Sequence, residues 1–278
     1  MITRAVGQDS VPRADDARSR RGSTRLGAAK SAVPAPPHYR LYRRLFGAED
    51  MHSHYRWNAL LPLVDLDARH TLEVGAGDGR MTFALVDAGL TGEVTAAEPD
   101  PVTSHQARET KALWGYENVE IMQERVGDLR ALQGAALYDQ VLAIDVLEHI
   151  EDDVEAMRQI ASVIRPGGRL VVSVPTPRYP EVFGRKFHEQ IGHVRDGYTL
   201  ETLTALLTGA GFSVDHVRYY SGRRVAAAAK AFYGSHVPFV LGVLWAPLLR
   251  PWLMRSETTV DPEWAVSLAV TARPSNRA

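Results

Sequence analysis

Residues 71–79 read Thr-Leu-Glu-Val-Gly-Ala-Gly-Asp-Gly, and this stretch decides the fold. A short apolar segment carries an acidic residue, Glu73, and then turns through three glycines, Gly75, Gly77 and Gly79. Because glycine has no Cβ, the backbone can turn tightly there and a ligand can approach it closely. The sequence then predicts a helix from about Arg80 to Asp87, whose amide-rich N-terminus points at that ligand. The pattern therefore predicts the ligand-binding turn of a Rossmann-like sheet.

The spacing of the glycines argues against a dinucleotide as that ligand. The fingerprint G-x-G-x-x-G needs its third glycine at position 80, where this chain has Arg80. The pattern that is present, E-x-G-x-G-x-G, resembles the first motif of the class I S-adenosylmethionine (SAM)-dependent methyltransferases. The resemblance implies that SAM is the cofactor, and that this loop holds its amino-acid part and its ribose.

Strand-like and helical stretches alternate from residue 70 to residue 220, which predicts a parallel sheet covered by helices on both faces. The resemblance covers this region and implies that a last strand runs antiparallel beside the sixth. The predicted fold class is α/β, a Rossmann-like doubly wound sheet that is mostly parallel, with N-terminal helices and an apolar insertion before the last strand. The seven expected strands are residues 71–75, 93–98, 119–123, 138–145, 169–174, 213–220 and 265–272.

The chain is predicted to form a single methyltransferase domain over residues 38–278, after a disordered tail at residues 1–37. The tail is rich in Arg, Asp, Ser, Ala and Pro and shows no periodicity. Aromatic, basic and leucine positions alternate over residues 38–66, which predicts a helical cover ahead of the SAM-binding core at residues 70–220. Residues 221–264 are an insertion or lid before the last strand.

The insertion contains an unusual apolar run, Val237–Leu249, of about 13 residues. A membrane-spanning helix needs about 20 residues, and Pro238 and Pro247 also disfavour one. The sequence leaves several roles open for the insertion: peripheral membrane contact through residues 236–254, a hydrophobic lid over the substrate, a subunit interface, or helices packed on the core.

Composition limits the classes of partner and compartment. The formal net charge is −1, which gives no general reason to expect nucleic-acid binding, so we expect no nucleic-acid partner. There is no cysteine, which excludes disulfides, thiolate metal sites and cysteine nucleophiles. The N-terminal charges precede no apolar segment of the secretory type, so we expect a cytoplasmic protein. The sequence does not indicate the oligomeric state.

Acidic side chains stand where a SAM site needs them. Glu73 and Asp78 flank the glycine loop, where a carboxylate can pair with the ammonium group of SAM. Glu98 ends the second strand, where a carboxylate can accept hydrogen bonds from both ribose hydroxyls. Pro99 follows it and is shaped to lie on adenine. From this loop and strand we predict cofactor contacts at Glu73, Gly75, Ala76, Gly77, Asp78, Gly79, Glu98 and Pro99.

Two further segments follow strands three and four. Asp128-Leu129 stands where the resemblance implies an acceptor for the adenine amino group and a helping amide. Residues 145–150 read Asp-Val-Leu-Glu-His-Ile and resemble the D-V-L-E-H-I segment of a methyltransferase branch that acts mostly on small molecules. We predict further cofactor contacts at Asp128, Leu129, Asp145, Val146 and His149. The alternative for Asp128 is a helix cap, and for Glu148 a first-turn carboxylate that favours the helix dipole.

Methyl transfer mainly requires alignment, and a general base is needed only when the nucleophile carries a proton. His193, and after it His188, are the candidate bases, because their loop after strand five should border the methyl group. The alternative is that both histidines bond to backbone groups and hold the loop closed. A metal site is not expected, because the ligand pattern of magnesium-dependent catechol methylation is not reproduced.

The predicted function is a SAM-dependent methyltransferase that acts on a small, hydrophobic molecule, at a hydroxyl oxygen. Methylation at carbon or nitrogen stays open, because the cofactor site is the same for all three. A second hypothesis is a SAM-binding scaffold or cyclase that transfers no methyl group. The third is a membrane-surface protein, anchored by residues 221–264, that methylates a lipid-borne acceptor.

Overall fold

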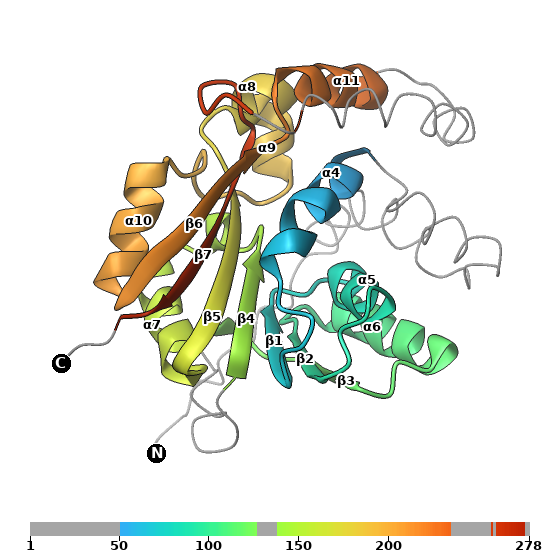
Figure 1. Ribbon diagram of the computed structural model, residues 1–278. Helices are drawn as coiled ribbons and strands as arrows, with labels where there is room; N and C mark the ends of the chain where they lie inside the picture. The colour runs from blue at the N-terminus through green and yellow to red at the C-terminus, as the bar shows by residue number, and fades with distance from the viewer. Residues whose placement is uncertain (1–50, 127–137, 235–256, 258–259, 276–278) are drawn as a thin grey trace, which may run out of the picture. The chain divides into compact units, whose positions relative to one another are not determined.

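The computed structural model describes residues 51–126, 138–234, 257 and 260–275, with the side chains of residues 51–54 and 229–234 left out. Seven strands form one sheet in the order β3-β2-β1-β4-β5-β7-β6 (Figure 1). Parallel pairing joins β3 to β2, β2 to β1, β1 to β4 and β4 to β5, whereas β7 is antiparallel to both of its neighbours. The strands are β1 (His70–Val74), β2 (Glu93–Ala97), β3 (Val119–Met122), β4 (Tyr138–Ile144), β5 (Ile164–Pro175), β6 (Phe212–Tyr220) and β7 (Ser267–Pro274).

This arrangement confirms the predicted fold class. All seven expected strands are present, and the last one is antiparallel and adjacent to β6. It also separates β6 from β5, because β7 is inserted between them. The order of strands reverses at β1, from which the chain first builds outward to β3 and then returns to β4 on the other side. Open α/β sheets bind ligands outside the carboxyl ends of the strands at such a switch point.

Helices connect the strands. The N-terminal part of the described chain forms α4 (Met51–Leu60) and the short 3-10 helix η1 (Leu61–Leu63). The remaining helices are α5 (Arg80–Asp87), α6 (Pro101–Trp114), η3 (Leu147–His149), α7 (Asp153–Val163), α8 (Tyr179–Phe183), α9 (Arg185–Gln190), α10 (Leu200–Gly209) and α11 (Arg223–Gly234).

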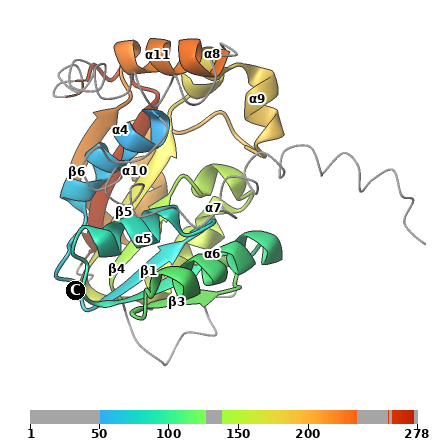
Figure 2. The same ribbon diagram turned by 90° about the vertical axis from the view of Figure 1, so that its right-hand side faces the viewer.

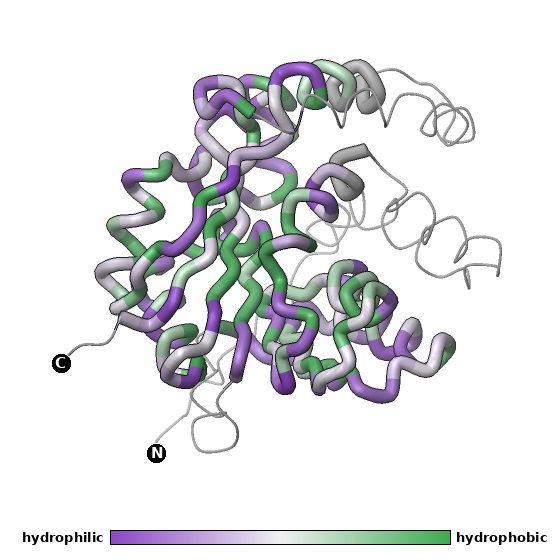
Figure 3. The backbone as a smooth tube through the Cα atoms, in the orientation of Figure 1, coloured by the Kyte–Doolittle hydropathy of each residue, from purple (hydrophilic) through white to green (hydrophobic). Residues whose placement is uncertain are grey.

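The sheet packs against an apolar core on each face. Figure 3 shows by colour that the central strands consist largely of hydrophobic residues. In β4, Val141 and Ala143 face a core formed with α7 and α10, while Leu142 and Ile144 face a second core formed with α4, η1 and α5. A strand that is covered on both sides needs apolar residues at successive positions, which explains its continuous apolar sequence. The edge-on view in Figure 2 shows α5 and α4 on one side of the strands.

Two details differ from the sequence-based expectation. β5 begins at Ile164 rather than at residue 169. The sequence Arg165-Pro166-Gly167-Gly168 is typical of a turn, but in the structure it is an irregularity within the strand, with Gly167 at φ +79°. The loop expected beyond β5, at residues 187–198, begins within the helix α9, and α8 precedes it. The predicted disordered tail (1–37), the Asp128-Leu129 pair and the apolar run Val237–Leu249 lie outside the described residues. Within the part that is described, no helix combines the length and the apolar character that crossing a membrane requires.

We expect the central strand to dominate stability. Replacing Leu142, which is fully buried, by Ala should lower the free energy of unfolding by about 2–5 kcal/mol, because the deletion leaves a cavity between packed neighbours. The matched control is Leu113→Ala, at a side chain that is 60% exposed, where we expect a change within about 0.5 kcal/mol. Urea unfolding followed by circular dichroism measures both. Equal losses in the two variants would contradict the assignment of the core.

Candidate functional site

A cavity of ≈ 1120 Å³ opens at the carboxyl ends of β1, β4 and β5. The glycine loop forms one wall, and the segment after β4 together with the loop beyond α9 forms another. α4 contributes Arg56 and Trp57. Ligand pockets in proteins typically measure about 300–1,000 Å³, so the cavity has room for a cofactor and part of a second molecule. Of the predicted site residues, the cavity is lined by Glu73, Gly75, Ala76, Gly77, Asp78, Asp145, His149 and His193.

The glycine loop is held in a left-handed conformation. Gly75, Gly77 and Gly79 have φ values of +67°, +59° and +79°. A Cβ on Gly75 would lie 2.4 Å from Cγ2 of Val146, whereas a Cβ on Gly77 would meet nothing within 4 Å. Val146 therefore packs against the loop from the side of β4. The open space beside Gly77 faces the cavity and lets a ligand approach the backbone.

Glu98 joins the loop to the end of β2. Its Oε2 accepts a hydrogen bond from the backbone N–H of Gly77 at 2.8 Å, and its Oε1 accepts one from Asp100 at 2.9 Å. Asp100 in turn caps α6 by accepting the N–H of Thr103. The carboxylate thus fixes the loop at the switch point of the sheet, next to the cavity rather than in its lining. Pro99, which follows it, is exposed.

Glu73 is a buried carboxyl on the wall of the cavity. It is 3% exposed, and the hydroxyl of Thr82 in α5 donates a hydrogen bond to its Oε2. Burial raises the pKa of Glu73 to about 7, with the Thr82 hydrogen bond opposing this and the nearby Asp78 charge adding to it. Desolvation favours the neutral form of an acid. A cation bound in the cavity would favour the charged form instead.

Asp145 directly follows β4 and adopts a left-handed conformation, with φ +51°, which is uncommon for a residue other than glycine. Both oxygens of its side chain have partners. The hydroxyl of Ser173 donates to Oδ1 at 2.7 Å, and the guanidinium of Arg56 lies 2.7 Å from Oδ2. Ser173 is also hydrogen-bonded to the hydroxyl of Tyr220 at 2.7 Å. Arg56 therefore ties α4 to the centre of the sheet, over the cavity.

Beyond Asp145 lies a group of polar side chains in aromatic surroundings. The rings of His149 and His193 are 4.8 Å apart, and those of Tyr179 and His193 are 5.2 Å apart. Burial lowers the pKa of His193 to about 4, and the neighbouring His149 and His188 add to this effect. Burial and the Asp145 charge raise the pKa of Glu148 well above its usual range. Burial therefore opposes charge on both Glu148 and His193.

His188 and His193 occupy different environments. His188 is buried, its Nε2 lies 3.0 Å from the carbonyl oxygen of Arg195, and it does not line the cavity. Its ring packs at 4.6 Å from that of His193, which does line the cavity. The contacts of His188 thus match the alternative that a histidine supports the loop. His193 is placed where a bound molecule can reach it.

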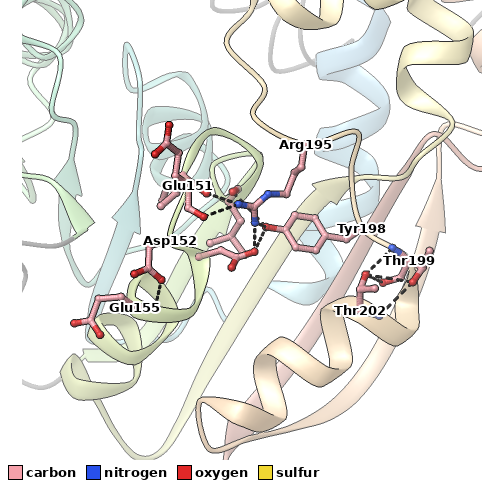
Figure 4. Close-up of polar contacts among 10 residues, drawn as sticks. Glu151, Asp152, Glu155, Arg195, Tyr198, Thr199 and Thr202 are labelled. Atoms are coloured by element: carbon pink, nitrogen blue, oxygen red, sulfur yellow. Dashed lines mark hydrogen bonds and ion pairs between the residues drawn. The ribbon is translucent and has the colours of Figure 1, made fainter.

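Arg195 braces the loop that carries His193. Its guanidinium donates to the carbonyl oxygens of Ile150 and Glu151 at 2.6 and 3.0 Å, and it also bonds to the carboxylate of Asp153 and to the hydroxyl of Tyr198. Figure 4 shows the guanidinium between the Glu151 backbone and the Tyr198 ring. This brace joins the loop to the turn between η3 and α7, so it keeps His193 close to the end of β4.

Three side chains of this wall are chemically suited to bind a metal. Glu148, His149 and His193 each offer a ligand atom, and these atoms lie within 4.8 Å of one another. Two ligands of a tetrahedral zinc ion with bonds of about 2.1 Å are roughly 3.4 Å apart. The group as it stands is wider than that, so it is not preformed for a zinc ion.

Sequence reasoning missed some residues of the cavity. Arg56 and Tyr179 carry no motif, and only the fold brings them to the ends of β4 and β5. Glu148 belongs to the D-V-L-E-H-I segment, but its sequence alone is equally compatible with a helix-dipole role. Its burial, with 1% of its surface exposed, is what sets it apart.

Comparison with known families identifies the core of the chain. Residues 72–170 match the family model of a methyltransferase domain. The matched segment begins within β1 and runs through the glycine loop, Glu98 and the Asp145–His149 segment. It is a domain of the SAM-dependent methyltransferase class, and SAM is its cofactor.

Individual relatives are distant. A tRNA U34 carboxymethyltransferase of Marinobacter nauticus is 26% identical over 156 residues, which cover 56% of this chain and 46% of that protein. A ubiquinone biosynthesis O-methyltransferase of Xanthomonas euvesicatoria is 29% identical over 164 residues, covering 55% of this chain and 66% of the relative. The chain thus spans less than two thirds of the length of either. The magnesium protoporphyrin IX methyltransferase of Synechocystis PCC 6803 shares the fold, with a TM-score of 0.53, 17% identity and coverage of 94% and 99% of the two chains.

These relatives correct one prediction. We expected a small hydrophobic partner because of the apolar insertion at residues 221–264, and we excluded nucleic acid on the basis of the net charge of −1. That exclusion was wrong, because tRNA U34 carboxymethyltransferases are among the similar proteins. The physical reason is that net charge sums over the whole surface and does not report the charge around one cavity.

The contact between Gly75 and Val146 can be tested by substitution. Gly75→Ala and Gly77→Ala both place a side chain at positive φ, which costs roughly 1–2 kcal/mol. Gly75→Ala also forces its Cβ onto Val146, so we expect it to lower the free energy of unfolding by more than Gly77→Ala does. Chemical denaturation of the SAM-free protein measures the difference.

The double variant Gly75→Ala/Val146→Ala serves as the control for the mechanism. Because Val146→Ala removes the Cγ atom that would collide, the second substitution should restore part of the stability lost in Gly75→Ala. Additive losses in the double variant would show that the two residues do not collide.

Proposed function

We propose that this chain, whose residues 72–170 form a SAM-dependent methyltransferase domain, transfers a methyl group to a hydroxyl oxygen of an acceptor that enters the cavity. The observation that carries the proposal is the continuity of the cavity from the glycine loop to the wall that contains His193. A cofactor at the loop and an acceptor at the wall would thereby share one cavity. Binding both molecules in one cavity brings the reacting groups into alignment.

The residues present fit SAM. The loop around Gly77 leaves the backbone open to the amino-acid part of the cofactor, and the helix α5 presents its N-terminus there. We assign Glu73 and Asp78 to the ammonium group and Glu98 to the ribose hydroxyls. Pro99 and Val146 would border the adenine and the methionine chain. The remaining cofactor contacts in this proposal are Gly75, Ala76, Gly79, Asp145 and His149, with Asp128 and Leu129 outside the described residues.

His193 is the proposed base, and His188 supports it from behind. When bound, SAM supplies a methyl group on a positively charged sulfur. His193 is neutral at pH 7 because its pKa is about 4, so its ring can accept a proton without first losing one. A pKa of about 4 makes it a weak base towards a free hydroxyl. It suffices when the oxygen is forming its third bond, since that oxygen is then far more acidic.

Two acceptor classes are supported by different observations. Ubiquinone biosynthesis O-methyltransferases, which resemble the chain at 29–34% identity, favour a small molecule with a hydroxyl. tRNA U34 carboxymethyltransferases, at 26–27% identity, favour tRNA. The small-molecule hydroxyl is the first candidate, because His193 at the far wall suits a nucleophile that carries a proton. Transfer to carbon or nitrogen, or binding of SAM without transfer, remain the alternatives.

Labelled SAM tests the function directly. The purified full chain is incubated with methyl-labelled SAM and either an extract of small molecules or total tRNA, both from the source organism. Label in the small-molecule fraction, in an alkali-stable ether, supports the proposal. Label in tRNA moves the acceptor to the second candidate. Absence of transfer in both arms, with SAM binding confirmed, contradicts the proposed activity.

Glu98→Gln provides the site control in the same assay. The substitution keeps an oxygen for the Gly77 amide but removes the charge, so we expect SAM affinity to fall roughly ten- to hundredfold. The matched control is Glu93→Gln at the opposite end of β2, where the side chain is 82% exposed and no loss is expected. Affinity is measured by calorimetry. A pure scaffold would keep its function in Glu98→Gln despite the weaker binding.

The pH dependence of transfer tests the role of His193. The base must be unprotonated, so kcat/KM for the acceptor should fall as the pH drops through about 4 and should not change near 6.5 on account of this group. His193→Gln should remove this fall in kcat/KM at low pH and should lower the rate by about 10²–10⁴-fold. Short assays after a pH jump avoid acid unfolding. Measurement at saturating SAM removes the effect of Glu73, whose pKa is about 7.

A fall in kcat/KM near pH 6.5 that is absent in His193→Gln would contradict a buried, neutral histidine. An unchanged rate in His193→Gln would show that no base is needed at this position.

A further inference from the structure

We propose that Trp264 is a positioning residue for the acceptor side of the cavity: it holds the start of α8 in place, and with it the side chain of Tyr179. The inference rests on the proposed function and deepens it, because it names what fixes the wall at which the acceptor binds. Trp264 is not among the described residues that line the cavity, so its effect on transfer has to pass through other residues.

Tyr179 is the first residue of α8 and lines the cavity. Its ring lies 5.2 Å from that of His193, the proposed base. Arg56 and Asp145 line the same cavity, where they form an ion pair. Tyr179 is therefore placed where a bound acceptor would meet it, and a shift of its ring would change the space open to that acceptor.

The turn before α8 is bonded to the segment that contains Trp264. The hydroxyl of Thr176 donates to the carbonyl oxygen of Ala265 at 2.6 Å. The Nε–H of Arg178 donates to the carbonyl oxygen of Glu263. The two acceptors are the neighbours of Trp264 in the sequence, so the backbone of Trp264 is fixed next to the start of α8.

Two guanidinium groups lie over the ring of Trp264. The Cζ atom of Arg178 is 4.4 Å from the ring centroid, and that of Arg223 is 4.7 Å from it. Both distances lie within the roughly 6 Å over which an aromatic face attracts a cation. Arg178 directly precedes Tyr179 and is the N-cap of α8, whereas Arg223 is the first residue of α11. One ring thus joins the starts of two helices.

The start of α11 is fixed independently of the ring. Both oxygens of the buried Glu257 carboxylate accept backbone hydrogen bonds, from the N–H of Ser221 at 2.6 Å and from that of Gly222 at 3.0 Å. These two residues directly precede Arg223. The guanidinium of Arg223 therefore extends from an anchored backbone, and the ring of Trp264 is held against a fixed point.

α11 extends this junction to α4. Val225 is buried in contact with Tyr55 of α4, and the next residue of α4 is Arg56, on the cavity. Figures 1 and 2 both show α11 beside α8. α4 and α8, which each supply side chains to the cavity, are thus connected to one another through α11 and Trp264.

α8 depends on such contacts because it is short. It has five residues, and no side chain caps its N-terminus. Isolated helices shorter than about 12–15 residues are marginal in water, so tertiary contacts must determine where α8 lies. Without the ring, Arg178 would keep its bond to the carbonyl oxygen of Glu263 and its surface contact with Glu181 at 3.2 Å. We therefore expect Tyr179 to move when the ring is removed, while the sheet stays intact.

The first test needs no acceptor. Fluorotyrosine is incorporated at position 179 of the full chain, and its ¹⁹F resonance is recorded with S-adenosylhomocysteine bound. Trp264→Leu should shift the resonance towards its position in the urea-unfolded chain. Trp264→Phe keeps an aromatic face for both guanidinium groups and should leave the resonance near the parent value. A resonance that Trp264→Leu does not shift, or that both variants shift equally, would overturn the proposal.

Arg223→Gln provides a milder variant in case Trp264→Leu does not fold. Because Arg223 is exposed, its replacement should leave the fold intact and shift the Tyr179 resonance in the same direction by a smaller amount. The matched control is Arg158→Gln on α7, at a side chain that is 63% exposed and lies 3.5 Å from Glu155, where no shift is expected. Equal responses to the two arginine substitutions would overturn the role of the ring.

The second test uses the acceptor identified with labelled SAM. Trp264→Leu should raise KM for the acceptor at least about fivefold, which corresponds to the loss of two exposed cation–π contacts, with a smaller change in kcat. Trp264→Phe should restore most of the affinity for the acceptor. Affinity for S-adenosylhomocysteine should not change. A loss of that affinity as large as the rise in KM would overturn the proposal, because it would show that the whole cavity has loosened.

A double variant tests whether Arg223 acts through the ring. If it does, Arg223→Gln should raise KM no further in the Trp264→Leu background, and additive effects would overturn the junction. Failure of the proposed function is distinguishable from failure of this inference. In that case the chain transfers no methyl group, while the ¹⁹F response of Tyr179 to Trp264→Leu is still seen.

Discussion

The position of β4 at the centre of the sheet is the constraint on which the rest of the structure depends. It is hydrogen-bonded to β1 on one side and to β5 on the other, and every one of its residues is buried. Its last residue therefore emerges between the glycine loop and the segment beyond β5. Asp145, in a left-handed conformation, turns the chain there, so that Val146 packs on Gly75 while Glu148 faces the loop of His193. One strand end thus contacts both halves of the cavity.

Much of this arrangement was predictable from the sequence. Continuous apolar strands separated by helical stretches indicate a parallel sheet, and E-x-G-x-G-x-G indicates where its ligand lies. The end of each strand could be placed to within a few residues. The prediction of strand boundaries failed where the hydrophobic pattern of the sequence is not periodic. The glycines at 167 and 168 predicted a turn, but β5 extends beyond them to Ile164, because Ile164 pairs with Tyr138 of β4 and the register resumes at Arg169 and Gln140. Sequence patterns do not reveal this long-range pairing.

The site was predictable to the extent that it is local in the sequence. The glycine loop, Glu98 and the D-V-L-E-H-I segment can each be recognised from the spacing of their residues along the sequence. Arg56 does not, because its contact with Asp145 joins positions 89 residues apart and depends on how α4 lies over the sheet. The difference between His188 and His193 was also beyond the sequence. Both are histidines of one short segment, and only the packing turns one towards a backbone carbonyl and the other towards the cavity.

The electrostatics of the wall follow from its burial. Arg56 and Asp145 form an ion pair, and burial raises the pKa of Glu148 and lowers that of His193, so it opposes charge on both side chains. A cationic methyl donor would therefore bring the main uncompensated charge into this part of the cavity. Transfer moves that charge to the imidazole of His193, where burial and two further histidines oppose it. The proton is consequently held weakly and is released soon after the methyl group has moved. A wall that stabilised the imidazolium strongly would retain the proton, and would slow the return of the base to its neutral form.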